Sequence, residues 1–392
     1  MKLRLEVEEI TSANEFYAMR QDWNHLVNDV ADNTFFLCWE RMAPAVRYLE
    51  KGSTLKILCI KDGGELLGIV PLKKFSRSVI GLLNYTMIES ISERAPGILL
   101  KKRKTECLHT IMTHLYAQKD WDFLNFNDIP ETFSIVNLLQ ASSKINFELE
   151  EGDVSPYITI PNSLSELYNY IKPSFRHNLR NDLRRLEKKH GEVTLKEYCE
   201  VGSLEEMMEK FFELHQKRWE SKRQPGVFKT KRLRDIFLAE AKLFSEIDCL
   251  RLRFLLAGQK PISVFYGYEH NKTLYYLLSG FDPSYASFGP TNLLLLKTLE
   301  KCVEEEIREL NFFSGYTSHK FRWCKNYRRN YSFKFINSKV RSKALSLAAR
   351  IARQKNINDK LWKILKIASL SIMGAIMYLN LLETLEMLFL SF

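Results

Sequence analysis

Three extended segments follow one another along the second half of the chain, joined by very short turns. They cover residues 249–256, 261–269 and 273–280, and each is rich in β-branched, aromatic and leucine residues. Connections this short join antiparallel neighbours, so the spacing predicts a three-stranded meander. A helix is predicted over 291–306 and a further strand over 308–313. This order predicts an α/β (α+β) unit with a mixed, mainly antiparallel sheet.

The first half contains a weaker copy of the same order. A hairpin predicted over 54–72, turning at Gly63-Gly64, matches the hairpin over 249–268. A strand over 121–126 matches the strand over 308–313, and both contain Leu-Asn-Phe. Because order and spacing agree, we expect two tandem copies of one fold.

The length of 392 residues fits two or three domains. A segment containing Gly152, Pro156 and Pro161 is predicted to cross from one copy to the next. We expect the first copy to be degenerate, since it shows no phosphate-binding loop at the start of a helix. The expected units are a first lobe over 1–155, a second lobe over 156–338 and a helical tail over 339–392.

The tail combines positive charge with apolar sequence. Sixteen uncharged residues lie between Lys366 and Glu383, fewer than the roughly 20 needed to span a bilayer. A basic amphipathic helix is predicted just before them, and the pair fits an anionic membrane surface. Helices docked on the domain or on a partner subunit are the alternative. The N-terminus has no apolar signal segment, so we expect a cytoplasmic protein, peripheral on the inner face of the membrane if the tail binds lipid.

The net charge of +11 is concentrated locally. From Tyr316 to Lys355 there are twelve Lys or Arg and no Asp or Glu. Arg176, Arg180 and Arg184 recur at i, i+4 and i+8 on a helix predicted to end before Gly191. Such charge favours phosphates, nucleotide cofactors, nucleic acid or acidic lipid, and a solvated surface is the alternative.

Several enzyme classes lack their sequence signatures. No P-loop, G-x-S-x-G or H-E-x-x-H motif is present. The seven cysteines form no C-x-x-C pair and no zinc spacing with histidine, so we expect reduced thiols and no metal site. Asp120 and Asp122 match the D-x-D pattern of glycosyltransferases, but so short a pattern arises often by chance.

Four stretches carry a family resemblance: SPYITIPNSLSELYNYIKPSFRHNLRNDLRRLEKKHG, KRW, PISVFYGYEHNKTLYYLLSGFDPSYASFGPTNLLLLKTLE and LNFFSGYTSHKFRW. In this order the chain resembles acetyltransferase-like proteins linked to cellulose and exopolysaccharide biosynthesis. That family is similar to the Fem-type peptidyltransferases. The resemblance implies two tandem acetyltransferase (GNAT) lobes. It further implies a transferase that moves an acyl group from acetyl-CoA or another acyl-CoA to an amine or hydroxyl of a sugar or cell-envelope precursor.

In that fold the donor lies beside the fourth strand of a lobe, and its pyrophosphate lies at the start of the following helix. The resemblance places the donor site at Phe288, Gly289, Thr291 and Asn292, with Arg176 and Arg180 holding phosphate. A helix N-terminus offers free N–H groups and a positive dipole end to such a group. The loop departs from the family pattern, because it has one glycine where several are common.

Residues at the active cleft are carried over in the same way. The resemblance favours Lys320, and His319 is a candidate base because its pKa is ordinarily near neutrality. Asp282 either orients a group or starts an Asp-Pro turn. Surface loops and core packing are the alternatives for all of these. The expected catalytic residues are Lys320, His319 and Asp282, and the expected substrate-binding residues are Arg218, Trp219 and Tyr316.

Two other functions stay open at this stage. A Fem-like transferase would take its donor from aminoacyl-tRNA, which the basic charge permits. A non-catalytic, membrane-associated assembly factor would keep the fold without the reaction.

Overall fold

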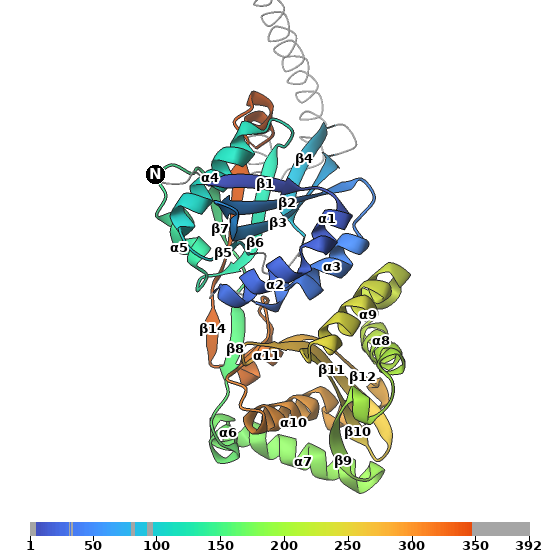
Figure 1. The fold of residues 1–392 in the computed structure, drawn as a ribbon. Helices are drawn as coiled ribbons and strands as arrows, with labels where there is room; N and C mark the ends of the chain where they lie inside the picture. The colour runs from blue at the N-terminus through green and yellow to red at the C-terminus, as the bar shows by residue number, and fades with distance from the viewer. Residues whose placement is uncertain (1–4, 31, 33, 80–82, 92–96, 347–392) are drawn as a thin grey trace, which may run out of the picture.

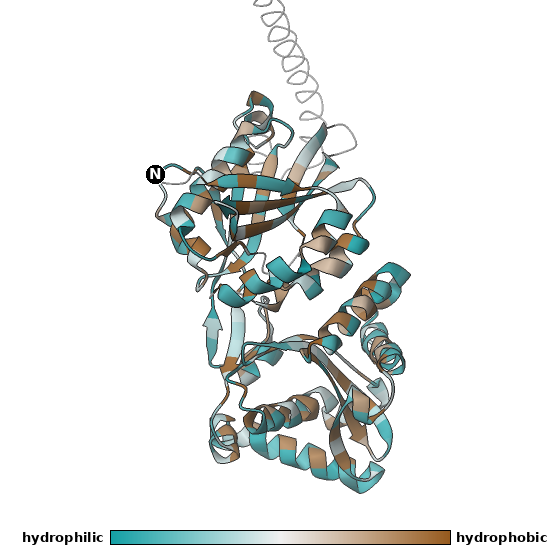
Figure 2. Ribbon diagram, viewed as in Figure 1, coloured by the Kyte–Doolittle hydropathy of each residue, from teal (hydrophilic) through white to brown (hydrophobic). Residues whose placement is uncertain are grey.

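The computed structural model contains two sheets, one in each lobe, with helices on both (Figure 1). It describes residues 5–30, 32, 34–79, 83–91 and 97–346. Apolar residues concentrate on the strands of both sheets, as the hydropathy colouring shows (Figure 2).

The first sheet has the order β1-β2-β3-β4-β6-β15-β7, and β5 pairs with β3. Its strands are β1 Glu6–Ile10, β2 Ser53–Asp62, β3 Glu65–Val79, β4 Leu83–Ser90, β5 Leu99–Leu100, β6 Phe123–Pro130, β7 Glu148–Glu151 and β15 Asn330–Ile336. The helices of this lobe are α1 Ala13–Ala18, α2 Arg20–Asp29, η1 Phe35–Leu37, α3 Trp39–Arg47, α4 Lys104–Ala117 and α5 Ser134–Gln140.

The second sheet has the order β14-β8-β13-β12-β11-β10-β9. Its strands are β8 Ser155–Thr159, β9 Val193–Glu197, β10 Leu250–Ala257, β11 Lys260–His270, β12 Thr273–Phe281, β13 Glu309–Asn311 and β14 Asn326–Arg328. The helices of this lobe are α6 Leu164–Tyr170, α7 Pro173–His190, η2 Tyr198–Glu200, α8 Leu204–Glu220, η3 Val227–Lys229, α9 Lys231–Glu246, η4 Pro283–Phe288, α10 Pro290–Glu304 and α11 Ser318–Trp323.

The two sheets repeat one topology. In the first, β1 to β4 are antiparallel neighbours and β4 pairs in parallel with β6. In the second, β9 to β12 are antiparallel neighbours and β12 pairs in parallel with β13. The predicted fold class, α/β with two tandem lobes and mixed, mainly antiparallel sheets, is therefore confirmed.

The lobes exchange strands through an antiparallel ribbon. The sequence places residues 330–337 in the second lobe, but β15 pairs with β6 and β7 in the first sheet. Next to it, β8 pairs with β14 in the second sheet. Between these pairs the Gly152 N–H donates to the Asn330 carbonyl at 2.8 Å. In sequence, β15 of the first sheet directly follows the second lobe, and β8 of the second sheet directly follows the first lobe.

One hydrophobic core extends across the two lobes. Phe35 of η1 lies 5.0 Å from Tyr268 of β11 and 5.7 Å from Phe313, measured between ring centroids. Arg41 of α3 forms an ion pair with Glu240 of α9, whose side chain is fully buried. An unpaired charge at such a site is costly, so this pair fixes how the lobes meet.

Local signals set several helix starts. Ser203 and Glu206 form the capping box at the start of α8, and Ser163 caps α6. Met19 leaves helical geometry and so separates α1 from α2.

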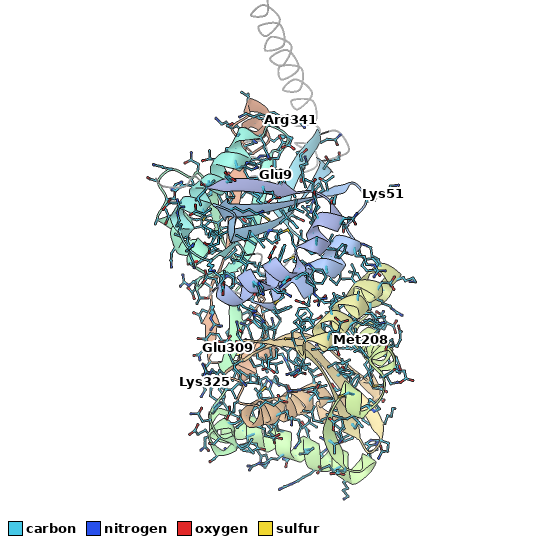
Figure 3. The ribbon with its side chains drawn as sticks, in the orientation of Figure 1. Glu9, Lys51, Met208, Glu309, Lys325 and Arg341 are labelled. Atoms are coloured by element: carbon cyan, nitrogen blue, oxygen red, sulfur yellow. The ribbon has the colours of Figure 1, made fainter. Side chains whose placement is uncertain are left out.

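The described chain ends on the first lobe, at the end remote from the second (Figure 3, near Arg341). Residues 340–346 are helical, and two buried serines hold them there. Ser342 donates to Asp122 Oδ1 at 2.7 Å, and Ser346 donates to Glu148 Oε1 at 3.2 Å. The apolar segment 367–382 lies outside the described residues. Within them, no helix has the length and apolarity that crossing a bilayer requires.

Candidate active site

The second sheet opens beside β12. Its pairing with β13 begins at Thr273↔Glu309 and ends at Tyr275↔Asn311, although β12 continues to Phe281. The last six residues of β12 therefore have no pairing with β13. Backbone N–H groups on an unpaired edge are available to a ligand.

Helix α8 packs closely on this end of β12. A side chain at Gly280 would place its Cβ 2.3 Å from the backbone nitrogen of His215, so only glycine permits this close approach. The approach places Arg218 over the strand, where its Nη1 donates to the Ser279 carbonyl at 3.0 Å and to the Ser279 hydroxyl at 2.7 Å. Trp219 is held in place by donating from Nε1 to His215 Nε2 at 3.0 Å.

Helix α10 begins at the same end of the strand. Gly289 precedes it with φ 58° and ψ 46°, a left-handed conformation that suits glycine. Pro290 occupies the first helical position, and no acidic residue lies in the first turn. Asn292 Oδ1 accepts from His319 Nε2 at 3.0 Å and from Trp323 Nε1 at 3.4 Å. The start of α10 is thus joined to α11.

His319 is a neutral imidazole among cations. Burial, followed by the charges of Arg218, Arg322, Lys222 and Lys320, lowers its pKa to about 4. Residues from α8, α10 and α11 therefore meet at one electropositive place. Its chemistry suits an anionic ligand. The same pKa makes His319 a weak proton acceptor at neutral pH.

Lys320 is engaged with the loop after β13. Its Nζ donates to the carbonyls of Phe313, Ser314 and Gly315 at 3.2, 3.0 and 3.2 Å. These bonds hold the loop in its turn. A catalytic role for Lys320 stays a prediction.

Asp282 caps the 3-10 helix that follows β12. Its Oδ1 accepts from the Ser284 N–H at 3.0 Å and hydroxyl at 2.7 Å, and Lys260 lies 3.4 Å away. Burial would raise its pKa, but these hydrogen bonds and the Lys260 charge lower it overall. The geometry is that of an Asp-Pro turn, and a catalytic role stays a prediction.

The arginines of α7 divide between two places. Arg176 donates to the Tyr168 carbonyl at 2.7 Å, and Arg180 lies over the Tyr168 ring, so both face α6. Arg185 and Lys189 instead lie over the ring of Phe288, which precedes α10. The cations of α7 beside the start of α10 are therefore ones that the sequence did not single out.

Other site residues could not be assigned from sequence. Tyr275 and Tyr276 point to opposite faces of β12. The Tyr276 ring lies 5.4 Å from Phe312, at the point where the sheet opens. Burial raises its pKa, while Ser279 and Arg218 act in the opposite direction. Alternation predicts two faces, but only the packed sheet shows which one meets α10.

Tyr316 and Cys324 lie near this region with different environments. Tyr316 is 70% exposed and stacks on Phe321 at 4.8 Å. Burial raises the pKa of Cys324 to about 12, so its thiol stays protonated at neutral pH. A thiolate nucleophile is not available there.

Among the described residues, no group of three or more His, Cys, Asp or Glu could hold a metal ion.

Comparison with known proteins agrees with this geometry. Residues 173–321 match the family model of an acetyltransferase (GNAT) domain. The match begins with α7 and ends within α11, so it contains β12, α10 and His319. No curated protein matches the chain.

Solved structures extend the likeness over both lobes. The crystal structure of FemX is similar at TM-score 0.60 and 12% identity, over 84% of this chain and 97% of that one. A conserved protein of unknown function from Bacteroides thetaiotaomicron VPI-5482 gives 0.54 and 12%, over 85% and 100%. L-PGS from Bacillus licheniformis gives 0.50 and 10%, over 83% and 94%. At these identities the likeness shows the fold alone.

Proposed function

We propose that the second lobe transfers an acyl group from acetyl-CoA or another acyl-CoA to an amine or hydroxyl. The observation that carries the proposal is the opening of the sheet, where β12 continues six residues beyond its pairing with β13. An extended thioester arm can form backbone hydrogen bonds along that unpaired edge. The GNAT domain match over 173–321 supports the same reaction.

The donor's phosphates would lie at the start of α10. Gly289 allows close approach of the backbone, and Thr291 and Asn292 form the first turn. Lys189, beside Phe288, supplies positive charge there, and Arg185, also beside Phe288, is paired with Asp182 at 3.2 Å. This arrangement supports the proposed donor residues Phe288, Gly289, Thr291 and Asn292. Arg176 and Arg180 contact Tyr168 of α6, so in this arrangement they do not bind the phosphates directly.

The proposed reaction is direct attack. The acceptor nitrogen or oxygen bonds to the thioester carbonyl carbon, the C–S bond breaks, and the CoA sulfur leaves as a thiolate that takes up a proton. Backbone N–H groups of the β12 edge stabilise the oxyanion. The acceptor's proton passes to water, because the lowered pKa of His319 makes it a weak base. Cys324 stays a thiol, so no covalent enzyme intermediate is needed.

The acceptor and the location rest on the sequence. The resemblance to exopolysaccharide-linked proteins favours a sugar or envelope precursor bound near Arg218, Trp219 and Tyr316. The tail over 339–392 favours a cytoplasmic protein peripheral to an anionic membrane. Removing residues 347–392 keeps the docked segment 340–346, and we expect it to lower binding to anionic liposomes in a flotation assay. Equal binding by the truncated protein would exclude the membrane role.

A Fem-like transferase using aminoacyl-tRNA is the second candidate. The fold match to FemX over 97% of its chain and the net charge of +11 favour it. Helices α8 and α9 pack on β12 and α3, so within 204–246 no helical arm projects freely toward tRNA. A non-catalytic assembly factor is the third candidate, and inactivity with every donor would support it.

Thermal unfolding with acetyl-CoA, longer acyl-CoAs, free CoA and aminoacyl-tRNA separates these candidates, because a ligand of the native state raises the midpoint. We expect the CoA compounds to raise it and tRNA to leave it unchanged. A rise with tRNA alone would favour the Fem-like reaction. No rise with any donor would favour the assembly factor.

A further inference from the structure

A pocket of about 290 Å³ lies at the lobe boundary, with α3 of the first lobe on one side and α9 of the second on the other. These two helices lie side by side (Figure 1). We propose, on the basis of the acyl transfer proposed above, that this α3–α9 pocket binds the aliphatic chain of the donor. The protein then takes a medium-chain acyl-CoA in preference to acetyl-CoA.

The pocket begins where β12 and β13 separate. The last pair of these strands is Tyr275↔Asn311. Leu277 and Leu278 lie beyond that pair on β12, Phe313 lies beyond it on the chain that leaves β13, and all three line the pocket. A thioester held at the unpaired edge of β12 would therefore have the pocket directly beside its acyl group.

A bulge in β12 turns two consecutive leucines toward the pocket. Successive residues of β11 pair with Leu278 and Tyr276, so Leu277 between them is an extra residue. A bulge interrupts the alternation of side chains along a strand and redirects one of them. Leu277 and Leu278 accordingly both line the pocket. Gly267 of β11 allows the strands to approach here, because a Cβ on it would lie 2.1 Å from the Tyr275 carbonyl oxygen.

The lining of the pocket suits an uncharged chain. Its apolar wall is completed by residues of α9 and of α3 with the turn after it: Leu233, Ile236, Phe237, Ala45 and Leu49. The charged residues that also line it are each joined in an ion pair: Arg41–Glu240, Lys73–Glu89 at 3.2 Å and Arg232–Glu50 at 3.4 Å. A charged ligand would have to displace one of these partners, whereas an aliphatic chain gains free energy by leaving water.

The volume of the pocket favours a chain longer than an acetyl group. Small-molecule sites begin at roughly 300 Å³, and this pocket is close to that size. Each methylene removed from water strengthens binding by roughly fourfold. An acetyl methyl would leave most of the apolar wall without a ligand, whereas an octanoyl chain could cover much of it.

The test is calorimetric titration of the full chain with free CoA, acetyl-CoA, butanoyl-CoA and octanoyl-CoA. We expect the Kd to fall with chain length and to be at least roughly tenfold lower for octanoyl-CoA than for acetyl-CoA. Equal Kd values for these two donors would overturn the acyl-chain site and leave the donor proposal standing. Absence of binding by every CoA compound would instead reject the donor proposal itself and the acyl-chain site with it.

A matched pair of variants locates the chain. Ala45→Phe fills the pocket from α3, whereas Ala18→Phe makes the same change on exposed surface at the end of α1. We expect the preference for octanoyl-CoA over acetyl-CoA to fall roughly tenfold in the first variant only. Ile236→Phe fills the pocket from α9 and gives the same test if Ala45→Phe does not fold. The wild-type preference in a folded pocket variant would show that the chain binds elsewhere and would reject the site.

Discussion

The fourth and fifth strands pair differently in the two lobes. In the first lobe, β4 pairs with β6 from Met87 to Glu89, and β4 ends one residue later at Ser90. In the second lobe, β12 continues from Tyr275 to Phe281 beyond its last pair. The same strand order therefore gives a closed sheet in one lobe and an open one in the other.

The helices that follow these strands differ in the same sense. Arg103 precedes α4 with φ 50°, and its guanidinium binds Asp62 at 2.5 Å and also binds Glu106. Gly289 precedes α10 with φ 58°, in a first turn without acidic residues. An acidic residue, Glu106, thus lies in the first turn of α4, whereas the first turn of α10 has none and the nearest carboxylate there, that of Asp182, belongs to α7. Equal backbone geometry does not make equal sites, because side-chain charge decides which helix start can receive an anion.

The largest expected effect concerns the packing of α8 on the open strand. Gly280→Ala would place a Cβ 2.3 Å from the backbone nitrogen of His215, and we expect it to lower the free energy of unfolding by about 3 kcal/mol. In the first lobe, the Cβ added by Gly64→Ala would meet no atom within 4 Å. Only the positive φ of 91° opposes this substitution, and it lowers the free energy of unfolding by about 1 kcal/mol. Urea unfolding of both variants measures the difference. Equal losses would show that α8 does not depend on this contact.

The second effect is a pH dependence centred on the second lobe. Burial, followed by the Arg218 charge, lowers the pKa of His215 from 6.5 to about 4. The unfolded chain then binds a proton before the folded one as pH falls below 6.5, so stability present above that pH is lost toward pH 4. The loss is about 3 kcal/mol for this group.

His215→Gln keeps an acceptor for Trp219 and does not titrate. We expect its free energy of unfolding to fall less than that of the wild type between pH 7 and 4, whereas His25→Gln, on exposed α2 surface of the first lobe, should follow the wild type. Chemical unfolding at several pH values gives the three slopes. If the free energy of unfolding changed equally with pH in all three proteins, His215 would not be the source of the pH dependence.

A third change gives α10 the kind of carboxylate that α4 already has. Asn292→Asp keeps the acceptor for His319 and adds a negative charge where the donor's phosphates are proposed to bind. We expect the Kd for acetyl-CoA to rise roughly tenfold in calorimetry. Asn137→Asp on α5 of the first lobe is the matched control and should not change it. Unchanged binding in both variants would place the donor elsewhere.

The smallest expected effect is at Arg180. Because its guanidinium faces the Tyr168 ring rather than the start of α10, Arg180→Ala should change the Kd for acetyl-CoA by less than about threefold. Arg185→Ala, beside Phe288, should change it more. The reverse order would restore the assignment of Arg180 that the family resemblance implied.

Local patterns predicted much of the fold and less of the site. The capping box of Ser203 and the turn at Gly63-Gly64 depend on neighbours in sequence, so helix starts and hairpins could be inferred from sequence alone. The partner of β15 could not, because an alternating strand does not specify which sheet it joins. Periodicity placed Arg176 and Arg180 on one helix face but did not show which helix that face meets. The three carbonyls bound by Lys320 depend equally on a loop whose shape only the assembled lobe defines.

The ribbon has a consequence for the order in which the protein is made. Strand β15 lies between β6 and β7, and in the first sheet β7 pairs with β15 alone among the described strands. While a ribosome is still adding the second lobe, all of residues 1–155 can have emerged, yet their sheet lacks the strand that holds its edge. The first lobe, although made first, can be completed only after residue 336 has been synthesised.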